Sequence, residues 1–291
     1  MIELVRDPAE MRKYVDMLRR NRISIGCVPT MGALHAGHAS LIERSYRDND
    51  RTIVSLFVNP LQFGPHEDLA KYPRDLEGDL EICAAAGANM VFAPSVQSLQ
   101  PPGRSTIVRV SGVSHDYEGT HREGHFDGVA TICATLFNLV QPDRAYFGQK
   151  DYQQTVVVRR MVQDLMMPTD IVVCPTLREP DGLAMSSRNR YLSPSEREEA
   201  LRLPRSLEAV EKAVLDGETD ADVLREILRE GMATADETVF TDYADIVHPD
   251  TLVPLGRVES RAVALAVLRL RDTRLLDNRI IAAPGTTAWE A

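Results

Sequence analysis

The chain has 291 residues, of which 44% are hydrophobic and 26% charged, a composition that excludes a disordered, collagenous or membrane-embedded protein. Its 33 Lys and Arg against 43 Asp and Glu give a net charge of −10, opposite in sign to the surfaces that bind nucleic-acid backbones. No apolar run approaches the roughly 18 residues of a membrane-spanning helix, and the charged segment 1–7 is unlike a signal peptide. We therefore expect a cytoplasmic protein that binds neither nucleic acid nor membrane.

The first part of the chain alternates strands with helices. Apolar runs rich in β-branched residues predict buried strands at 23–28, 52–58, 90–93, 145–147 and 171–174. Helix-length segments lie between them, at 39–48, 75–86, 129–139 and 152–165. This order predicts an α/β fold: a Rossmann-like, mostly parallel sheet with helices on both faces.

The pattern changes after about residue 174. Ser193, Pro194 and Glu196 form a helix start with a capping box, and two amphipathic helices follow. Strand-like runs come next, at 243–247, 262–268 and 273–276. We expect a larger domain at 1–175 and a smaller α+β C-terminal domain at 176–291.

The first strand runs into a turn with two glycines and two histidines. Gly32 and Gly37 allow a ligand to approach the backbone, and the helix that follows offers unpaired N–H groups to an anion. His35 and His38, three residues apart, can face the same point. This arrangement suits a nucleotide phosphate. For this motif by itself, a turn whose histidines only hydrogen-bond to local backbone groups is an equally good interpretation.

Two further loops follow strands at the same predicted edge. Asn59 and Gln62 are uncharged amides suited to hydrogen-bonding hydroxyls or a carboxylate. Lys150 could place a charge on phosphate, Asp151 could accept ribose hydroxyls, and Gln154 lies one helical turn further. A polar turn and a solvated surface ion pair are the respective alternatives.

A fourth polar loop lies at the predicted domain junction. It carries two hydroxyls and an arginine, Ser186, Ser187 and Arg188, shortly after Gly182. Such a loop can wrap a triphosphate and close over it. By contrast, His121 and His125 have the spacing of a zinc pair, but their surroundings suggest a loop and no third ligand is near.

Six sequence blocks resemble the pantoate–β-alanine ligase (pantothenate synthetase) family of the nucleotidylyltransferase superfamily. They occur in the family's order and spacing, over the predicted sheet domain and the junction. The blocks are PTMGALHAGH, FVNPLQFG, YPR at 72–74, HREGHFDGV, FGQKDYQQ and DGLAMSSRNRYL.

The resemblance implies a carbon–nitrogen-bond-forming ligase with pantoate, β-alanine and ATP as substrates. Pantoate's carboxylate would attack the α-phosphorus of ATP, giving pantoyl adenylate and pyrophosphate. The amine of β-alanine would then displace AMP to give pantothenate. The resemblance also implies Mg²⁺ and a homodimer.

Individual roles follow from matching positions. The resemblance places His38, His35 and Lys150 in catalysis. It assigns pantoate or β-alanine to Gln62, Gln154, Asn59, Arg122 and His125, and magnesium to Asp79, which Gly78 precedes where a second acidic residue can stand. ATP is assigned to Met31, Gly32, Ala33, Leu34, His35, Ala36, Gly37, His38, Gly148, Gln149, Lys150, Asp151, Leu177, Met185, Ser186, Ser187 and Arg188.

Two other functions remain open at this stage. One is another nucleotidylyltransferase of the superfamily, acting on a phosphorylated small molecule, which would need more cations near Asn59 and Gln62. The other is a non-catalytic nucleotide-binding module, against which the net charge and the complete set of motifs argue.

Overall fold

The computed structural model describes residues 2–65 and 67–286, which divide into two compact units. The first unit comprises residues up to 149 together with 153–175, and the second comprises 150–152 together with the chain from Thr176 onward. Within the described residues, no helix has both the length and the apolarity needed to cross a membrane.

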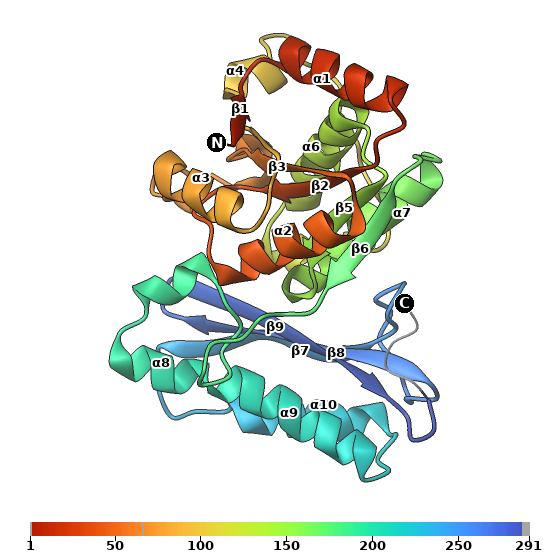
Figure 1. The fold of residues 1–291 in the computed structure, drawn as a ribbon. Helices are drawn as coiled ribbons and strands as arrows, with labels where there is room; N and C mark the ends of the chain where they lie inside the picture. Colours follow the sequence, from red (N-terminus) through yellow and green to blue (C-terminus); the bar gives the residue numbers. More distant parts are fainter. Residues whose placement is uncertain (1, 66, 287–291) are drawn as a thin grey trace. The chain divides into compact units, whose positions relative to one another are not determined.

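The first unit is built on a six-stranded sheet in the order β1-β4-β3-β2-β5-β6, in which all neighbouring strands are parallel (Figure 1). Its strands are β1 (Glu3–Val5), β2 (Ile25–Thr30), β3 (Arg51–Leu56), β4 (Met90–Phe92), β5 (Arg144–Gly148) and β6 (Asp170–Cys174). From β2 the chain adds β3 and β4 on one side and β5 and β6 on the other. The order therefore reverses at β2, where parallel sheets bind ligands beyond the carboxyl ends of their strands.

Helices cover both faces of this sheet because successive strand side chains alternate in direction. On β2, Ile25 and Cys27 join the core formed with α1, α6 and α7, whereas Val28 joins the core formed with α2 and α3. These helices are α1 (Pro8–Arg20), α2 (Ala36–Asp48), α3 (Leu76–Ala85), α6 (His125–Val140) and α7 (Tyr152–Asp164), with short α4 (Val96–Leu99) and α5 (Glu118–His121) beside them. The predicted α/β class and its helices on both faces are confirmed.

Several boundaries differ from the sequence-based expectation, and two of them lie near the predicted site residues. Helix α6 begins at His125, four residues before the predicted start, because Gly124 adopts the left-handed conformation (φ 76°) immediately before it. His121, expected in a loop, ends the short helix α5.

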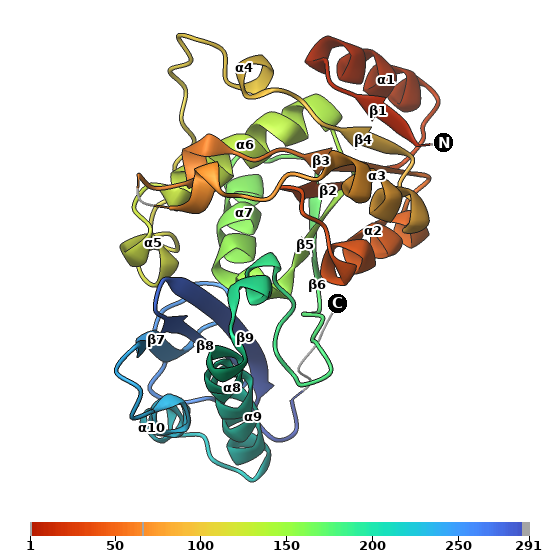
Figure 2. The ribbon, with the colours of Figure 1, turned by 90° about the vertical axis from the view of Figure 1, so that its left-hand side faces the viewer.

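The second unit packs helices on a three-stranded antiparallel sheet, β7-β8-β9 (Figure 2). Its strands are β7 (Val239–Val247), β8 (Arg261–Leu270) and β9 (Thr273–Ala282), and its helices are α8 (Pro194–Ala200), α9 (Arg202–Leu215) and α10 (Ala221–Met232). The predicted capping box is present at α8, where Ser193 and Glu196 bond reciprocally. This capping box and the amphipathic helices α9 and α10 all follow the expected sequence pattern.

Candidate active site

The turn between β2 and α2 presents two adjacent imidazoles, tilted by 41° to each other, at a helix N-terminus. Nδ1 of His35 accepts the Gly37 N–H at 3.1 Å, and Nδ1 of His38 accepts the His35 N–H at 3.3 Å. The ring centroids are 4.1 Å apart. Because both Nδ1 atoms act as acceptors, the neutral rings carry their hydrogen on Nε2, which makes each Nε2 a donor. The turn therefore combines two imidazole N–H groups with the positive end of a 13-residue helix.

Asp79 holds this turn in shape from α3. Its buried carboxylate accepts the N–H groups of Ala33, at 3.0 Å, and Leu34, at 2.7 Å. A Cβ at position 32 would lie 2.8 Å from Asp79 Oδ2, and Gly32 has φ 83°, so glycine is required there on both counts.

The predicted magnesium role of Asp79 stays a prediction beside these contacts, since a carboxylate oxygen that accepts one N–H keeps a second lone pair. Both of its oxygens are engaged by backbone N–H groups. Among the described residues no group of three His, Cys, Asp or Glu side chains is arranged to hold a metal ion. Its role in this structure is to shape the loop that carries the histidines.

Asn59 fixes the orientation of Gln62 after β3. Its Nδ2 donates to Gln62 Oε1 at 3.0 Å and to the Gly128 carbonyl at 3.1 Å, while its Oδ1 accepts from Gln100 and from the Leu61 N–H. Since the Gln62 oxygen is held by a donor, its Nε2 points the other way, toward Met31 Sδ at 3.2 Å. Sulfur is a weak acceptor, so this N–H₂ group is well placed for a ligand oxygen. Asn59 itself is 1% exposed, and its amide is fully used inside the protein.

Arg122 and His125 hold the backbone of the same loop. The Gln62 carbonyl accepts from His125 Nδ1 at 2.8 Å, so the neutral ring's Nε2 accepts from Arg122 Nη1 at 3.1 Å. Arg122 also forms a bidentate ion pair with Glu67, at 2.7 and 2.8 Å. Burial, and then the Arg122 charge, lower the pKa of His125 from 6.5 to about 4.

The backbone of α6 touches this loop directly. A Cβ on Gly128 would lie 2.3 Å from the Leu61 carbonyl oxygen, so only glycine allows the approach. Together with the preceding contacts, this shows that Asn59, Arg122 and His125 hold the loop of Gln62, and their expected direct contacts with substrate stay predictions. Glu67, which the sequence did not single out, completes the ion pair.

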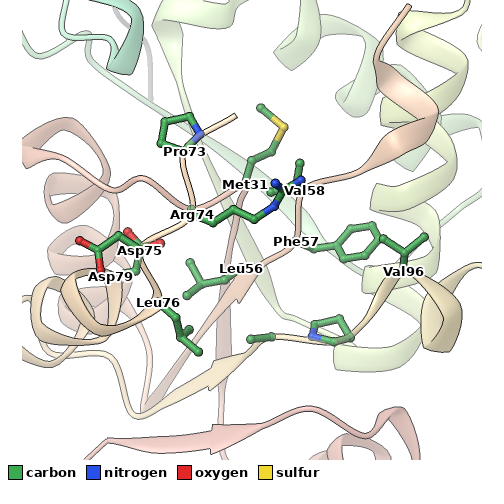
Figure 3. Close-up of a pocket in the computed structure, with 13 residues that line it drawn as sticks. Met31, Leu56, Phe57, Val58, Pro73, Arg74, Asp75, Leu76, Asp79 and Val96 are labelled. Carbon is green, nitrogen blue, oxygen red and sulfur yellow. The ribbon is translucent and has the colours of Figure 1, made fainter. Parts of the chain in front are cut away.

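A cavity of about 230 Å³ opens at the carboxyl ends of β2, β3 and β4 (Figure 3). Met31, Phe57 and Val58 line it on one side, and Arg74 extends toward Val58. Asp75, also in the lining, accepts the Gly78 N–H at 3.1 Å. Apolar side chains share the lining with one cation, Arg74, and two carboxylates, Asp75 and Asp79, and the volume suits a ligand smaller than a typical drug. Arg74 belongs to the YPR block, and that block was the only sequence signal for it.

Two glutamines that begin α7 have different environments. Gln153 is buried and holds the segment before α5, bonding the Glu118 N–H and the Val113 and Asp116 carbonyls. Gln154 is half-buried, and its side chain makes no hydrogen bond within the described part of the chain. Gln154 is thus the one with donor and acceptor capacity to spare. Gly148 ends β5, and Gln149 is buried in the short 3₁₀ turn after it.

The other predicted nucleotide residues lie in the second unit. Lys150 Nζ is 4.0 Å from Asp151 Oδ1. A hairpin pairs Leu177 with Met185, whose N–H donates to the Leu177 carbonyl at 2.9 Å.

The last predicted nucleotide segment continues from this hairpin. Ser186 caps the 3₁₀ turn Ser187–Tyr191 and accepts the Arg188 N–H at 3.3 Å. Both Ser187 and Arg188 stand in this turn.

The parallel sheet, the paired imidazoles and the adjoining cavity define an α/β enzyme that acts on anionic small molecules. The pantoate-beta-alanine ligase family model matches residues 3–280. The chain is 48% identical over 280 residues to the pantothenate synthetase of Moorella thermoacetica, covering 96% of this chain and 99% of that relative. The chain belongs to the pantoate-beta-alanine ligase family, which confirms the predicted membership.

Solved structures of proteins in this family are also similar to this chain. The pantothenate synthetase of Thermus thermophilus has a TM-score of 0.90 at 46% identity, over 96% of this chain and 99% of that one. The pantoate-beta-alanine ligase of Francisella tularensis, described as complexed with beta-gamma ATP and beta-alanine, has a TM-score of 0.77 at 30% identity, over 96% and 98%.

The buried His125 predicts a pH dependence of stability. Its folded pKa of about 4 lies below the ordinary 6.5, so between these values the unfolded chain binds more protons. The free energy of unfolding should fall as pH drops from about 6.5 to about 4, by at most about 1.4 kcal/mol per pH unit from this group. In His125→Gln, whose amide can still donate to Gln62 and accept from Arg122, that slope should flatten.

Urea unfolding at several pH values measures both slopes. His115→Gln, at an exposed position, is the control and should keep the wild-type slope. Equal slopes for wild type and His125→Gln would contradict the assignment of a buried neutral histidine.

Proposed function

We propose that this protein joins pantoate to β-alanine, using ATP and releasing AMP and pyrophosphate, through a pantoyl adenylate. The observation that carries the proposal is two sets of oriented donors on loops that follow neighbouring strands: the imidazoles of His35 and His38, and the N–H₂ of Gln62. The first set suits phosphate oxygens, and the second suits the oxygens of a hydroxy acid.

In the first step, a carboxylate oxygen of pantoate forms a bond to the α-phosphorus and the bond to pyrophosphate breaks. A carboxylate alone is a poor acylating agent because its leaving group would be oxide, and adenylation replaces this with a phosphate. Charge on the transferring phosphate grows during displacement, and the imidazole N–H groups of His38 and His35 stabilise it. Lys150 supplies a positive charge to the phosphates.

In the second step, the amine of β-alanine attacks the acyl carbon, loses a proton and expels AMP. Gln62 and Gln154 hold pantoate through hydroxyl and carboxylate oxygens. Asn59, Arg122 and His125 act through Gln62 by fixing its loop. Met31 to His38, Gly148 to Asp151, Leu177 and Met185 to Arg188 bind ATP.

Three further assignments belong to this proposal. Mg²⁺ accompanies the triphosphate of ATP, and Asp79 is its candidate protein ligand through the lone pairs that the histidine turn does not use. The chain is a homodimer, and it works in the cytoplasm.

The environment of Gln62 argues against a phosphorylated substrate. The nearby Arg122 is already paired with Glu67, so its charge is offset. Pyrophosphate release from ATP should depend on pantoate and precede β-alanine addition. Release only with a phosphorylated alcohol would favour the other nucleotidylyltransferase, and ATP binding without AMP formation would favour a non-catalytic module.

Two substitutions at His38 test its role in adenylate formation. His38→Ala and His38→Asn should both lower the single-turnover rate by roughly 10² to 10³, the usual effect of losing one such donor. Asn can still accept the His35 N–H but has no donor at the position of Nε2. His38→Asn therefore separates the loss of the donor from the loss of the helix cap. Near-normal adenylation by His38→Asn would show that capping alone is the function of this histidine.

Gln62→Glu tests the orientation of the amide. Glutamate can still accept from Asn59 but replaces the N–H₂ group with an oxygen that repels a carboxylate. The KM for pantoate should rise roughly 10-fold to 100-fold, equivalent to about 1.4 to 2.8 kcal/mol, while the KM for ATP changes little. Steady-state kinetics with each substrate varied in turn measure this, and equal losses for both would point to general damage.

A further inference from the structure

Residues 150–152 belong to the second unit although the chain on both sides of them belongs to the first. Two buried side chains hold this short segment. Asn278 Nδ2, on β9, donates to the Lys150 carbonyl at 2.9 Å, and the Tyr152 hydroxyl donates to the Pro249 carbonyl at 3.0 Å. Asn278 is 2% exposed. The main chain of Lys150 is therefore fixed to β9.

The neighbouring residue on β9 holds a second segment assigned to ATP. Asp277, 3% exposed, accepts two N–H groups of the Arg178 guanidinium at 2.6 and 3.1 Å. Arg178 also donates to the Gly182 carbonyl at 3.1 Å, which closes the hairpin that leads into Met185. Thus Asp277 secures the hairpin that precedes Ser186, Ser187 and Arg188.

We propose that Asp277 and Asn278 are positioning residues for the nucleotide, holding Lys150 and the hairpin at fixed places on one strand. Successive side chains of a strand point to opposite sides, so this pair can reach two segments that one side chain could not. Asp277 and Asn278 are themselves buried, and a buried polar side chain that loses its partner is costly. The inference rests on the proposed function, because that function assigns both segments to ATP.

A purely structural role is the alternative, and the same sheet provides a matched control. Asp242 on β7 is also a buried carboxylate with arginine partners, Arg269 at 3.1 Å and Arg274 at 2.6 Å. Neither partner lies in a segment assigned to ATP. Asp242→Asn therefore removes a comparable buried charge without touching those segments.

The test measures the Kd for ATP by titration calorimetry, and the KM for ATP and for pantoate, in the full chain. Asn278→Ala and Asp277→Asn should each weaken ATP binding roughly fivefold to tenfold, the factor expected for one lost hydrogen bond. The KM for pantoate should change less than about twofold, within the scatter of neutral substitutions. Asp242→Asn should leave both substrates near wild type, whatever its melting temperature.

Two outcomes would overturn the inference: ATP affinity equal to that of Asp242→Asn, or equal losses for ATP and pantoate. If Asn278→Ala fails to fold, Asp277→Asn decides, because it keeps the size of the side chain while it removes the charge and one of the two oxygens that accept from Arg178. ATP binding is measured without turnover, so the two proposals can fail separately. A wild-type protein that binds ATP but releases no pyrophosphate when pantoate is added would refute the proposed function. The ATP affinities of the variants would still decide this inference.

Discussion

The site depends on buried polar side chains that hydrogen-bond to the backbone of its loops. These loops lack the regular backbone hydrogen bonds of a helix or a sheet. Asp79 accepts two N–H groups of the histidine turn, and His125 donates to the carbonyl of Gln62. A buried backbone group without a partner costs about as much as a lost hydrogen bond. These contacts fix the loops before any ligand arrives, and the groups left facing outward are therefore set in advance.

Preset donors are what the proposed chemistry requires. Charge moves onto phosphate oxygens during adenylation, and donors that are already oriented stabilise it without reorganising. The His35 and His38 rings meet this condition because each accepts a backbone N–H at Nδ1, which orients the ring and places the hydrogen of the neutral form on Nε2. Likewise, the contact with Asn59 orients the Gln62 amide so that its N–H₂ group faces Met31 Sδ, a weak acceptor.

Much of this fold could be predicted from sequence periodicity, because buried strands and amphipathic helices have regular patterns. Strand β1 was missed because it has only three residues, and α1 was missed although Met11, Val15 and Leu18 recur on one face. The start of α6 depended on the left-handed Gly124, which no apolar pattern reveals.

The sequence could predict where the loops of the site lie in the chain, but not which contacts their side chains make. The motifs pointed to Asp79, Asn59, Arg122 and His125, yet a sequence cannot show which backbone group a buried polar side chain satisfies. Each was therefore expected to bind a ligand directly. Asn278 and Asp277 gave no signal, since their partners Lys150 and Arg178 lie about a hundred residues or more away in the chain.

The central claim is that pantoate becomes an acyl adenylate, and oxygen-18 in both carboxylate positions of pantoate tests it most directly. One labelled oxygen bridges to phosphorus and leaves with AMP when β-alanine attacks, while the other stays in the amide. Mass spectrometry should find one label in AMP and one in pantothenate. Unlabelled AMP, with label in pyrophosphate or phosphate instead, would contradict the account.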